Sequence, residues 1–254
     1  MRIIKNYKEY EVYSSLRLPV NVPVIIRCDG RNFHRLARDL SLEKPYDKSF
    51  IENIIEAAKE IYREGFNPNL IYLFSDEINF VFVSELPFNR RLEKILSIIP
   101  SIVSSKLTSI LYLTRKYYNV VSFDARAIPL PKEEIVGYLQ WRQSEAWRNC
   151  INSYAYFALL ANGCTPKEAT RKLEGLKCGE RQEIVFKMLK INLNNIPEWQ
   201  KRGVLIYKKI ETRICENKLT RKKIEVARRK IFVNFNVPLF TTLEGRRLLE
   251  RLLL

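Results

Sequence analysis

The sequence predicts an α+β protein in which a small mixed sheet carries helices on one face. Apolar runs with many β-branched residues, typical of buried strands, occupy residues 22–28, 70–74, 78–83 and 120–128. Between them, residues 47–64 and 87–117 place apolar side chains at helical spacing. The order is helix, strand, helix, hairpin, helix, strand and further helices, which fits one sheet with helices packed against it.

Most of these elements have a start or stop signal. The helix over 47–64 ends at Gly65, and the helix over 87–117 contains Pro100, where we expect a break. A later helix starts at Thr165, an N-cap followed by proline and, three residues on, glutamate. The remaining expected elements are a short helix within 1–17, helices at 132–162, 182–190 and 243–252, and strands at 203–208 and 231–237.

This organisation suggests three parts. Residues 1–131 form a catalytic domain, and residues 132–208 add a helical region whose returning strand belongs to the same catalytic unit. Residues 209–254 are a basic C-terminal extension. Hydrophobic residues make up 46% of the 254 positions, and no run approaches the roughly 18 consecutive apolar residues of a membrane helix. We therefore expect a cytoplasmic protein with no membrane partner.

The chain is strongly basic. It has 44 Lys and Arg against 28 Asp and Glu, a formal charge of +16 and a pI near 9.7. The excess is concentrated after residue 200, which favours a polyanionic partner such as nucleic acid over the alternative of a generally basic proteome. Five scattered cysteines and one histidine make a zinc site or a disulfide framework improbable. Any catalytic metal should therefore rest on oxygen ligands, as Mg²⁺ does.

Two acidic residues stand at the ends of predicted strands. Asp29 follows the first strand, and Asp76 sits with Ser75 and Glu77 at the tip of the hairpin. A carboxylate beside buried strands is costly unless its charge is compensated, and two of them could share divalent cations. We take Asp29 and Asp76 as metal ligands, with the Gly30 carbonyl as a third. Glu77 is either a supporting acid behind the ligands or a surface residue.

The residues around these acids are suited to phosphate. Residues 31–34 open a short helix whose N–H groups, with the side chains of Asn32 and His34, can contact phosphate oxygens. Ser75 and Lys44 are further candidates for phosphate contact. On the long helix of 132–162, Trp141 is explained by packing. Arg142 and Gln143 beside it, and Arg148 and Asn149 further on, are less easily explained that way.

These motifs resemble those of one family, the tRNA(His) guanylyltransferases and related 3′-to-5′ polymerases. The resemblance covers about residues 7–208 and leaves the basic segment after Lys209 outside it. Its principal segments, in order, are Asp29-Gly30-Arg31-Asn32-Phe33-His34, Lys44-Pro45 with Asp47, Ser75-Asp76-Glu77, Phe123-Asp124 with Arg126, Trp141-Arg142-Gln143, Gly163 with Thr165-Pro166, and Lys201 with Gly203.

The resemblance implies a fold and a chemistry. The fold is a polymerase-like palm, and two Mg²⁺ ions are held by Asp29, Asp76 and the Gly30 carbonyl. The segment from Asp29 to His34, including Arg31 and Phe33, embraces a nucleoside triphosphate together with Ser75 and Asp76. The reaction adds a nucleotide, from GTP or another triphosphate, to the 5′ end of tRNA after activation by ATP. The family also implies a homotetramer and tRNA contacts, for which we expect Arg126, Arg142, Gln143, Arg148 and Asn149.

One segment departs from the eukaryotic pattern. Those enzymes carry His-Ile-Asn-Asn where this chain has Trp147-Arg148-Asn149-Cys150. The chain is therefore more similar to the archaeal and bacterial guanylyltransferase-like proteins, which add nucleotides opposite a template. Two alternatives stay open at this point. A nucleotide cyclase of palm architecture would use the same two carboxylates without RNA, and a non-catalytic RNA-binding protein would use them only structurally.

Overall fold

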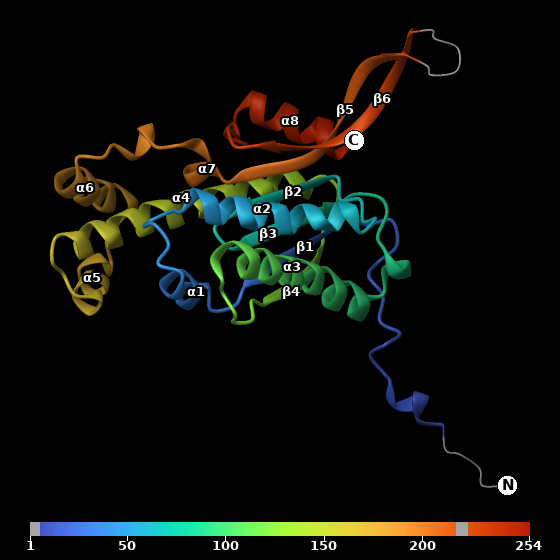
Figure 1. The fold of residues 1–254 in the computed structure, drawn as a ribbon, viewed down its shortest axis with the longest axis horizontal. Helices are drawn as coiled ribbons and strands as arrows, with labels where there is room; N and C mark the ends of the chain where they lie inside the picture. Colours follow the sequence, from blue (N-terminus) through green and yellow to red (C-terminus); the bar gives the residue numbers. More distant parts are fainter. Residues whose placement is uncertain (1–5, 217–222) are drawn as a thin grey trace.

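The protein is built around one six-stranded sheet in the order β4-β1-β3-β2-β5-β6 (Figure 1). The computed structural model describes residues 6–216 and 223–254. The α+β class is confirmed, but each described pair of neighbouring strands is antiparallel, so the sheet is not mixed. The strands are β1 (Val24–Gly30), β2 (Leu70–Phe74), β3 (Glu77–Phe82), β4 (Phe123–Pro129), β5 (Val204–Glu216) and β6 (Lys223–Asn234).

Helices cover both faces of the sheet, which corrects the expectation of one covered face. On the first face, α2 (Lys48–Arg63) and α3 (Leu92–Arg115) bury a core that includes Ile26 and Phe80. On the second face, α4 (Glu134–Ala161) and α8 (Leu243–Leu253) pack on residues such as Ile25 and Tyr72. Successive strand residues point to opposite faces, so β1 and β2 serve both cores and read as continuous apolar runs.

The remaining helices are short or lie away from the sheet. The C-terminal half of α4 leaves the sheet and packs with two helices in a separate apolar cluster that contains Cys150, Leu159 and Val185 (Figure 1). The two helices that pack with α4 are α5 (Pro166–Leu173) and α6 (Cys178–Leu189). The other short elements are α1 (Phe33–Asp39), α7 (Glu198–Arg202) and the 3-10 turns Tyr7–Tyr10, Phe88–Arg90 and Leu193–Asn195. The capping box predicted at Thr165 is present. The predicted division at residues 131 and 208 stays a prediction.

Helix α3 differs from its predicted form. It runs unbroken through Pro100, where a break was expected. It does so because Ile95, Ile99, Val103, Leu107 and Leu111 form one buried stripe, whose burial outweighs the cost of a proline inside a helix. Among the described residues, α3 alone is long and apolar enough to cross a membrane, and here a third of its most apolar stretch is buried inside the protein.

The C-terminal extension contains most of a long hairpin and helix α8. β5 starts beside β2, then continues with β6 as a hairpin that projects beyond the helices (Figure 1). Only the first residues of β5 pair with β2, from Val204 to Ile206. The strand predicted at 203–208 therefore extends well past its expected end, and α8 lies beside the base of the hairpin.

Candidate active site

The register of the sheet places three acidic residues side by side. Asp29, near the end of β1, lies opposite Glu77 of β3 on one side and opposite Asp124 of β4 on the other. Directly paired residues of antiparallel strands point to the same face, here the face that α4 covers in part. The sequence did not indicate a role for Asp124, because its position opposite Asp29 follows only from the strand pairing.

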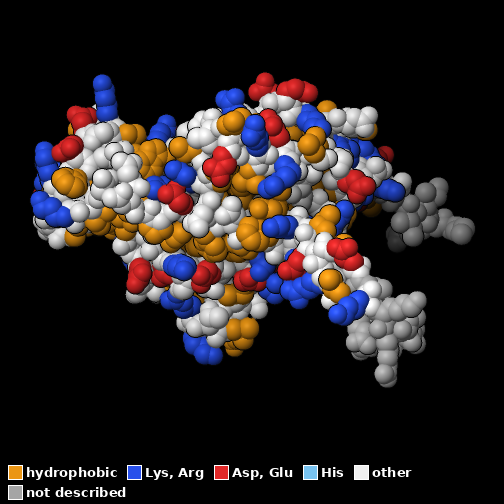
Figure 2. Space-filling model, turned by 90° about the horizontal axis from the view of Figure 1, so that it is seen from above, with side chains coloured by type: hydrophobic (Ala, Val, Ile, Leu, Met, Phe, Trp, Pro, Cys, Tyr) orange, Lys and Arg blue, Asp and Glu red, His pale blue; other side chains and the backbone are white. Residues whose placement is uncertain are grey.

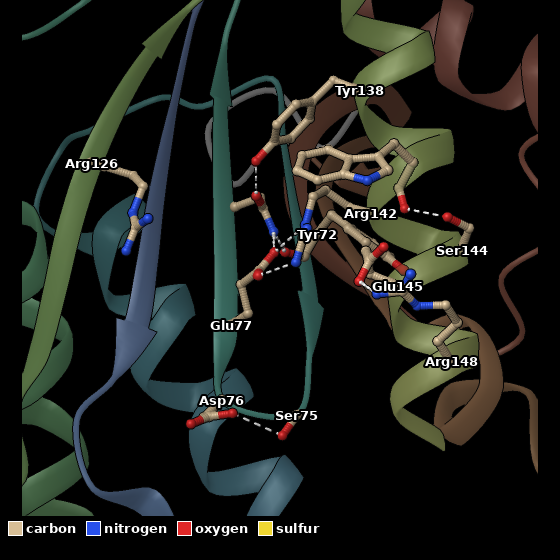
Figure 3. A network of polar contacts seen from close by, with 12 residues as sticks. Tyr72, Ser75, Asp76, Glu77, Arg126, Tyr138, Arg142, Ser144, Glu145 and Arg148 are labelled. Carbon is tan, nitrogen blue, oxygen red and sulfur yellow. Dashed lines mark hydrogen bonds and ion pairs between the residues drawn. The ribbon is translucent and has the colours of Figure 1, made fainter. Parts of the chain in front are cut away.

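Asp76 lies at the tip of the β2–β3 hairpin, as predicted. Phe74 pairs with Glu77, so Ser75 and Asp76 alone form the turn. Ser75 has a φ of 50°, a left-handed conformation that non-glycine residues seldom adopt and that is often found at functional sites. Its hydroxyl donates a hydrogen bond to Asp76 Oδ1 at 2.8 Å (Figure 3), which fixes the carboxylate at the turn.

The two aspartates carry uncompensated negative charge. Burial raises the pKa of Asp29, and the nearby Glu77 and Asp124 carboxylates raise it further, while Arg126 and Arg27 oppose the shift. Burial also raises the pKa of Asp76, with added contributions from Asp29 and Glu77 against the hydrogen bond from Ser75. A cation bound between Asp29 and Asp76 would remove this repulsion.

A cavity of about 420 Å³ opens beside these residues. It is lined by every predicted nucleotide-binding residue except Asp29 and Arg31, namely Gly30, Asn32, Phe33, His34, Lys44, Ser75 and Asp76. The structure adds Ser153 and Phe157 of α4, which the sequence did not indicate. Lys44 Nζ lies 5.5 Å from the centre of the Phe157 ring, and partial burial lowers the pKa of Lys44.

Gly30 is needed for the shape of this cavity. A side chain at position 30 would overlap with the ring of Phe33. That ring stands between Phe50 and Phe123, with a distance of 5.1 Å between the Phe33 and Phe123 centroids. Displacing Phe33 would therefore disturb both the cavity wall and the core beneath it.

Glu77 is a buried partner of α4, and the structure decides between its two predicted roles. Arg142 Nε donates to Glu77 Oε1 at 2.9 Å, and a second guanidinium nitrogen pairs with Oε2 (Figure 3). Asn79 donates to the same Oε1 at 2.8 Å and accepts from the Tyr138 hydroxyl at 2.8 Å. Glu77 and Arg142 are each 8% exposed. Glu77 is thus buried and paired with Arg142, so it is not a surface residue.

The predicted tRNA contacts are corrected in two cases. Arg142 is committed to Glu77, and Gln143 is 4% exposed. The Gln143 amide binds the backbone of the segment before α8, through the Pro238 carbonyl and the Phe240 N–H. Neither side chain is available to an RNA. Arg126, Arg148 and Asn149 are exposed and remain candidates.

The oxygen atoms at this site suit a hard cation such as Mg²⁺, which would take its remaining ligands from the substrate phosphates. No group of three His, Cys, Asp or Glu side chains within 6–216 and 223–254 is close enough to hold a metal alone. The carboxylates of Asp29 and Asp76 and a backbone carbonyl are oxygen donors, and Mg²⁺ commonly takes one or two carboxylates plus substrate phosphates. The four cysteines whose side chains are described are free thiols.

Comparison with known proteins now places the chain. Residues 4–131 match the family described as tRNAHis guanylyltransferase, and residues 133–236 match the Thg1 C-terminal domain. The chain belongs to the Thg1 family. The probable tRNA(His) guanylyltransferase of Drosophila melanogaster is 33% identical over 210 residues, 80% of this chain and 72% of that protein. The Saccharomyces cerevisiae enzyme is 31% identical over 198 residues, 74% and 83% of the two chains.

Solved Thg1-family structures share the fold. A bacterial Thg1-like protein in complex with ATP superposes with a TM-score of 0.76 and 28% identity, covering 97% of this chain and 96% of that one. Yeast tRNA(His) guanylyltransferase gives 0.70 and 27%, covering 79% and 92%. The family resemblance therefore extends beyond Lys209, where the sequence motifs end, and includes much of the β5–β6 hairpin.

The buried ion pair predicts a measurable stability effect. Glu77→Ala leaves Arg142 charged and unpaired in the interior, so the free energy of unfolding should fall by about 3–5 kcal/mol. The double variant Glu77→Leu/Arg142→Met removes both charges and should recover most of that loss. Urea denaturation monitored by circular dichroism measures both. A single variant within about 1 kcal/mol of the wild type would contradict a buried pair.

The raised pKa values predict the opposite effect at the two aspartates. In chelated buffer at neutral pH, Asp29→Asn or Asp76→Asn should increase the free energy of unfolding by about 0.5–1 kcal/mol, because each removes a repelled carboxylate. In the wild type, the destabilisation caused by these two ionised carboxylates should diminish as the pH falls through their raised pKa values. Thermal unfolding measures it, and Glu85→Gln, at an exposed acid away from the site, is the control. Destabilisation by both active-site variants would contradict the repulsion.

Proposed function

We propose that this protein adds nucleotides to the 5′ end of tRNA in the 3′-to-5′ direction. Membership of the Thg1 family supports this reaction. The observation that carries it is the cavity at the sheet edge, where phosphate-binding side chains from residues 30–47 and the β2–β3 turn surround Asp76. A cyclase would need the same acids, but nothing in its reaction calls for the basic hairpin. A non-catalytic protein would not need two repelled carboxylates.

Asp29, Asp76 and the Gly30 carbonyl would hold Mg²⁺, with two ions per site as in the family resemblance. Bound there, Mg²⁺ supplies charge stabilisation for the transferring phosphoryl group and a lowered pKa for the attacking hydroxyl. The protein's own contribution is to orient the ligands. The Ser75 hydroxyl donates a hydrogen bond to Asp76 Oδ1, and the Glu77–Arg142 ion pair fixes the first residue of β3, next to the turn.

The triphosphate of the incoming nucleotide is bound by Asn32, His34 and Lys44, and Ser75 lines the same cavity with its hydroxyl donated to Asp76. Lys44 has its charge partly desolvated against Phe157, so a phosphate oxygen would be a favourable partner. The 3′-hydroxyl of this nucleotide forms a bond to the activated 5′ phosphorus of the RNA. The activating group leaves as the new P–O bond forms. Relatives of known structure bind ATP and GTP, and both are proposed as ligands here.

Templated repair of shortened tRNA 5′ ends is the form of the reaction that we favour. Trp147, in place of the histidine of the eukaryotic segment, half-buries its ring in a cavity between α4 and α7. Its neighbour Arg148 pairs with Glu145 at 2.6 Å. This segment therefore differs in size and charge from the eukaryotic one. The family further suggests a homotetramer, and the composition suggests a cytoplasmic protein.

The β5–β6 hairpin is proposed to bind the tRNA backbone. In the strand register, Lys209 lies opposite Lys230 and Glu211 lies opposite Arg228, so these four side chains lie on one face of the hairpin. Lys and Arg side chains also lie along this arm and around its base (Figure 2). Glu211 is the only acid among these four, and it is paired with Lys230. Among the described residues, Lys209, which lies beside the Phe232 ring, and Arg228 have no acidic partner and can meet phosphates.

The extension reaction tests the proposed function. Purified protein should extend a 5′-labelled tRNA that lacks its first nucleotide, given Mg²⁺ and one triphosphate at a time. Incorporation should follow the base opposite the gap. Asp29→Ala and Asp76→Ala should lower the rate by at least about 10³-fold while keeping the circular dichroism spectrum. No extension, even from 5′-triphosphorylated RNA, would overturn the proposal.

The hairpin charges predict a salt effect. Lys209→Gln/Arg228→Gln should weaken tRNA binding. It should also reduce the slope of the logarithm of the tRNA association constant against the logarithm of the KCl concentration by roughly one per lost phosphate contact. Fluorescence anisotropy across a range of KCl concentrations measures this slope. The charge-preserving pair Lys209→Arg/Arg228→Lys should retain the wild-type slope. An unchanged slope in the glutamine variant would place the tRNA elsewhere on the protein.

A further inference from the structure

Trp141 lies on α4 beside the acidic end of the sheet, and packing accounts for only part of its position. The residue is 49% exposed, although a large aromatic side chain gains much from burial. It does not line the nucleotide cavity. Its neighbour Arg142 is buried and committed to Glu77. The indole is therefore the group at this point of α4 that a ligand can reach.

The exposed ring is held in one orientation. The Arg142 guanidinium carbon lies 4.5 Å from the centre of the Trp141 ring and is fixed by its ion pair with Glu77. The Tyr138 ring meets the indole edge to face, with the centroids 5.7 Å apart. The Tyr138 hydroxyl is in turn bound to Asn79 at 2.8 Å. An aromatic ring that is fixed before binding loses little conformational entropy when a planar ligand stacks on it.

Arg142 connects this ring to the catalytic end of the sheet. The guanidinium carbon also lies 5.3 Å from the centre of the Phe74 ring, and Phe74 directly precedes the β2–β3 turn. Glu77, which Arg142 binds (Figure 3), is paired across the strands with Asp29. A planar group stacked on Trp141 would therefore lie beside the metal ligands without entering the nucleotide cavity.

Exposed arginines flank the ring. Arg148 lies about two turns further along α4, on the same side of the helix as Trp141. Arg126 of β4 is exposed on the sheet face toward which Asp29 points. Their ion pairs with Glu145 and Asp124 involve exposed arginine side chains, and such pairs are weak enough to exchange for phosphate. An aromatic platform between cations suits a nucleic acid strand, whose base stacks while its phosphates meet the arginines.

Templated addition leaves one base in need of such support. When a tRNA lacks its first nucleotide, the base opposite the gap is unpaired until the incoming nucleotide arrives. Unpaired bases are commonly held by stacking on aromatic side chains, which tolerate all four bases because every base has a π face. A template base must be read by the nucleotide and not by the protein. The Trp141 ring meets this requirement, since Arg142 beneath it is occupied by Glu77 and adds no hydrogen bond to a base edge.

We propose that Trp141 stacks on the unpaired template base opposite the 5′ end that is extended. This inference rests on the proposed function, and within it on templated addition, because it names a binding residue for the strand opposite the reacting one. The 5′ phosphate and the triphosphate both stay at the metal site of Asp29 and Asp76, and Trp141 touches neither. Its role is to hold the template base with its pairing edge free for the incoming nucleotide.

The fluorescence of 2-aminopurine tests this contact. The analogue replaces the base opposite the gap in a shortened tRNA, and the full-length protein is added in Mg²⁺ without nucleotide. Stacking on Trp141 should quench the fluorescence. The wild type should also bind a shortened tRNA with a natural base there about 5- to 150-fold more tightly than one with an abasic residue. Trp141→Leu should abolish the quenching and the preference, and Trp141→Phe should retain both in part.

Matched controls separate this contact from its neighbours. Trp147→Phe changes the tryptophan in the cavity between α4 and α7, so it should keep the wild-type quenching and preference. Trp141→Leu should keep the wild-type affinity for GTP and the wild-type circular dichroism spectrum. Equal affinity of the wild type for the intact and the abasic tRNA would overturn the proposal. So would quenching that survives Trp141→Leu, or a preference confined to one of the four bases, which would indicate readout by hydrogen bonds.

The same variants distinguish this inference from the proposed function. If the wild type quenches the analogue and Trp141→Leu does not, but no nucleotide is added to any RNA, the stacking site stands and the reaction assignment fails. If the wild type adds nucleotides opposite a template and Trp141→Leu does so with unchanged KM for the RNA and unchanged selectivity, the reaction stands and the stacking assignment is wrong.

Discussion

The buried pair of Glu77 and Arg142 is the interaction on which the site depends. It joins the end of β3 to α4 in a place where both side chains are almost inaccessible to water. Burying two charges is favourable only if each is fully satisfied. Here Asn79 and Tyr138 complete the hydrogen bonds of the carboxylate end, and the Trp141 ring lies 4.5 Å from the guanidinium carbon. The orientation of α4 over β2 and β3 follows from this network.

That orientation determines what reaches the nucleotide cavity. Phe157 lies about four helical turns beyond Arg142 on the same continuous helix. Because α4 is anchored at Arg142, its C-terminal half extends past the β2–β3 turn and brings Ser153 and Phe157 into the cavity wall, where Phe157 lies close to Lys44. The ion pair also holds the Glu77 carboxylate close to Asp29, where its charge raises the pKa of Asp29. Negative charge therefore accumulates around Asp29 and Asp76, where a cation can bind.

The sequence predicted those parts of the structure that local patterns control. The acidic turn at Ser75-Asp76, the Thr165 cap and most element positions follow from residue types within a few positions. Arg142 and Gln143 were misread because a polar residue on a helix gives no sign of the tertiary partner that buries it. The length of the β5–β6 hairpin was missed for a related reason. An arm with solvent on both faces needs no alternation of apolar residues, so its strands carry little periodic signal.

The position of Asp124 was equally hidden, since only the register of β1 with β4 sets it opposite Asp29. This register has a consequence for the whole edge of the sheet. Negative charge accumulates along Asp29, Asp76 and Asp124, while positive charge accumulates at Arg31 and Arg35 immediately after β1. A reaction that joins a nucleotide to a phosphorylated RNA end must hold two anionic groups close together without their repelling one another. A cation held by the Asp29 and Asp76 carboxylates would offset that repulsion.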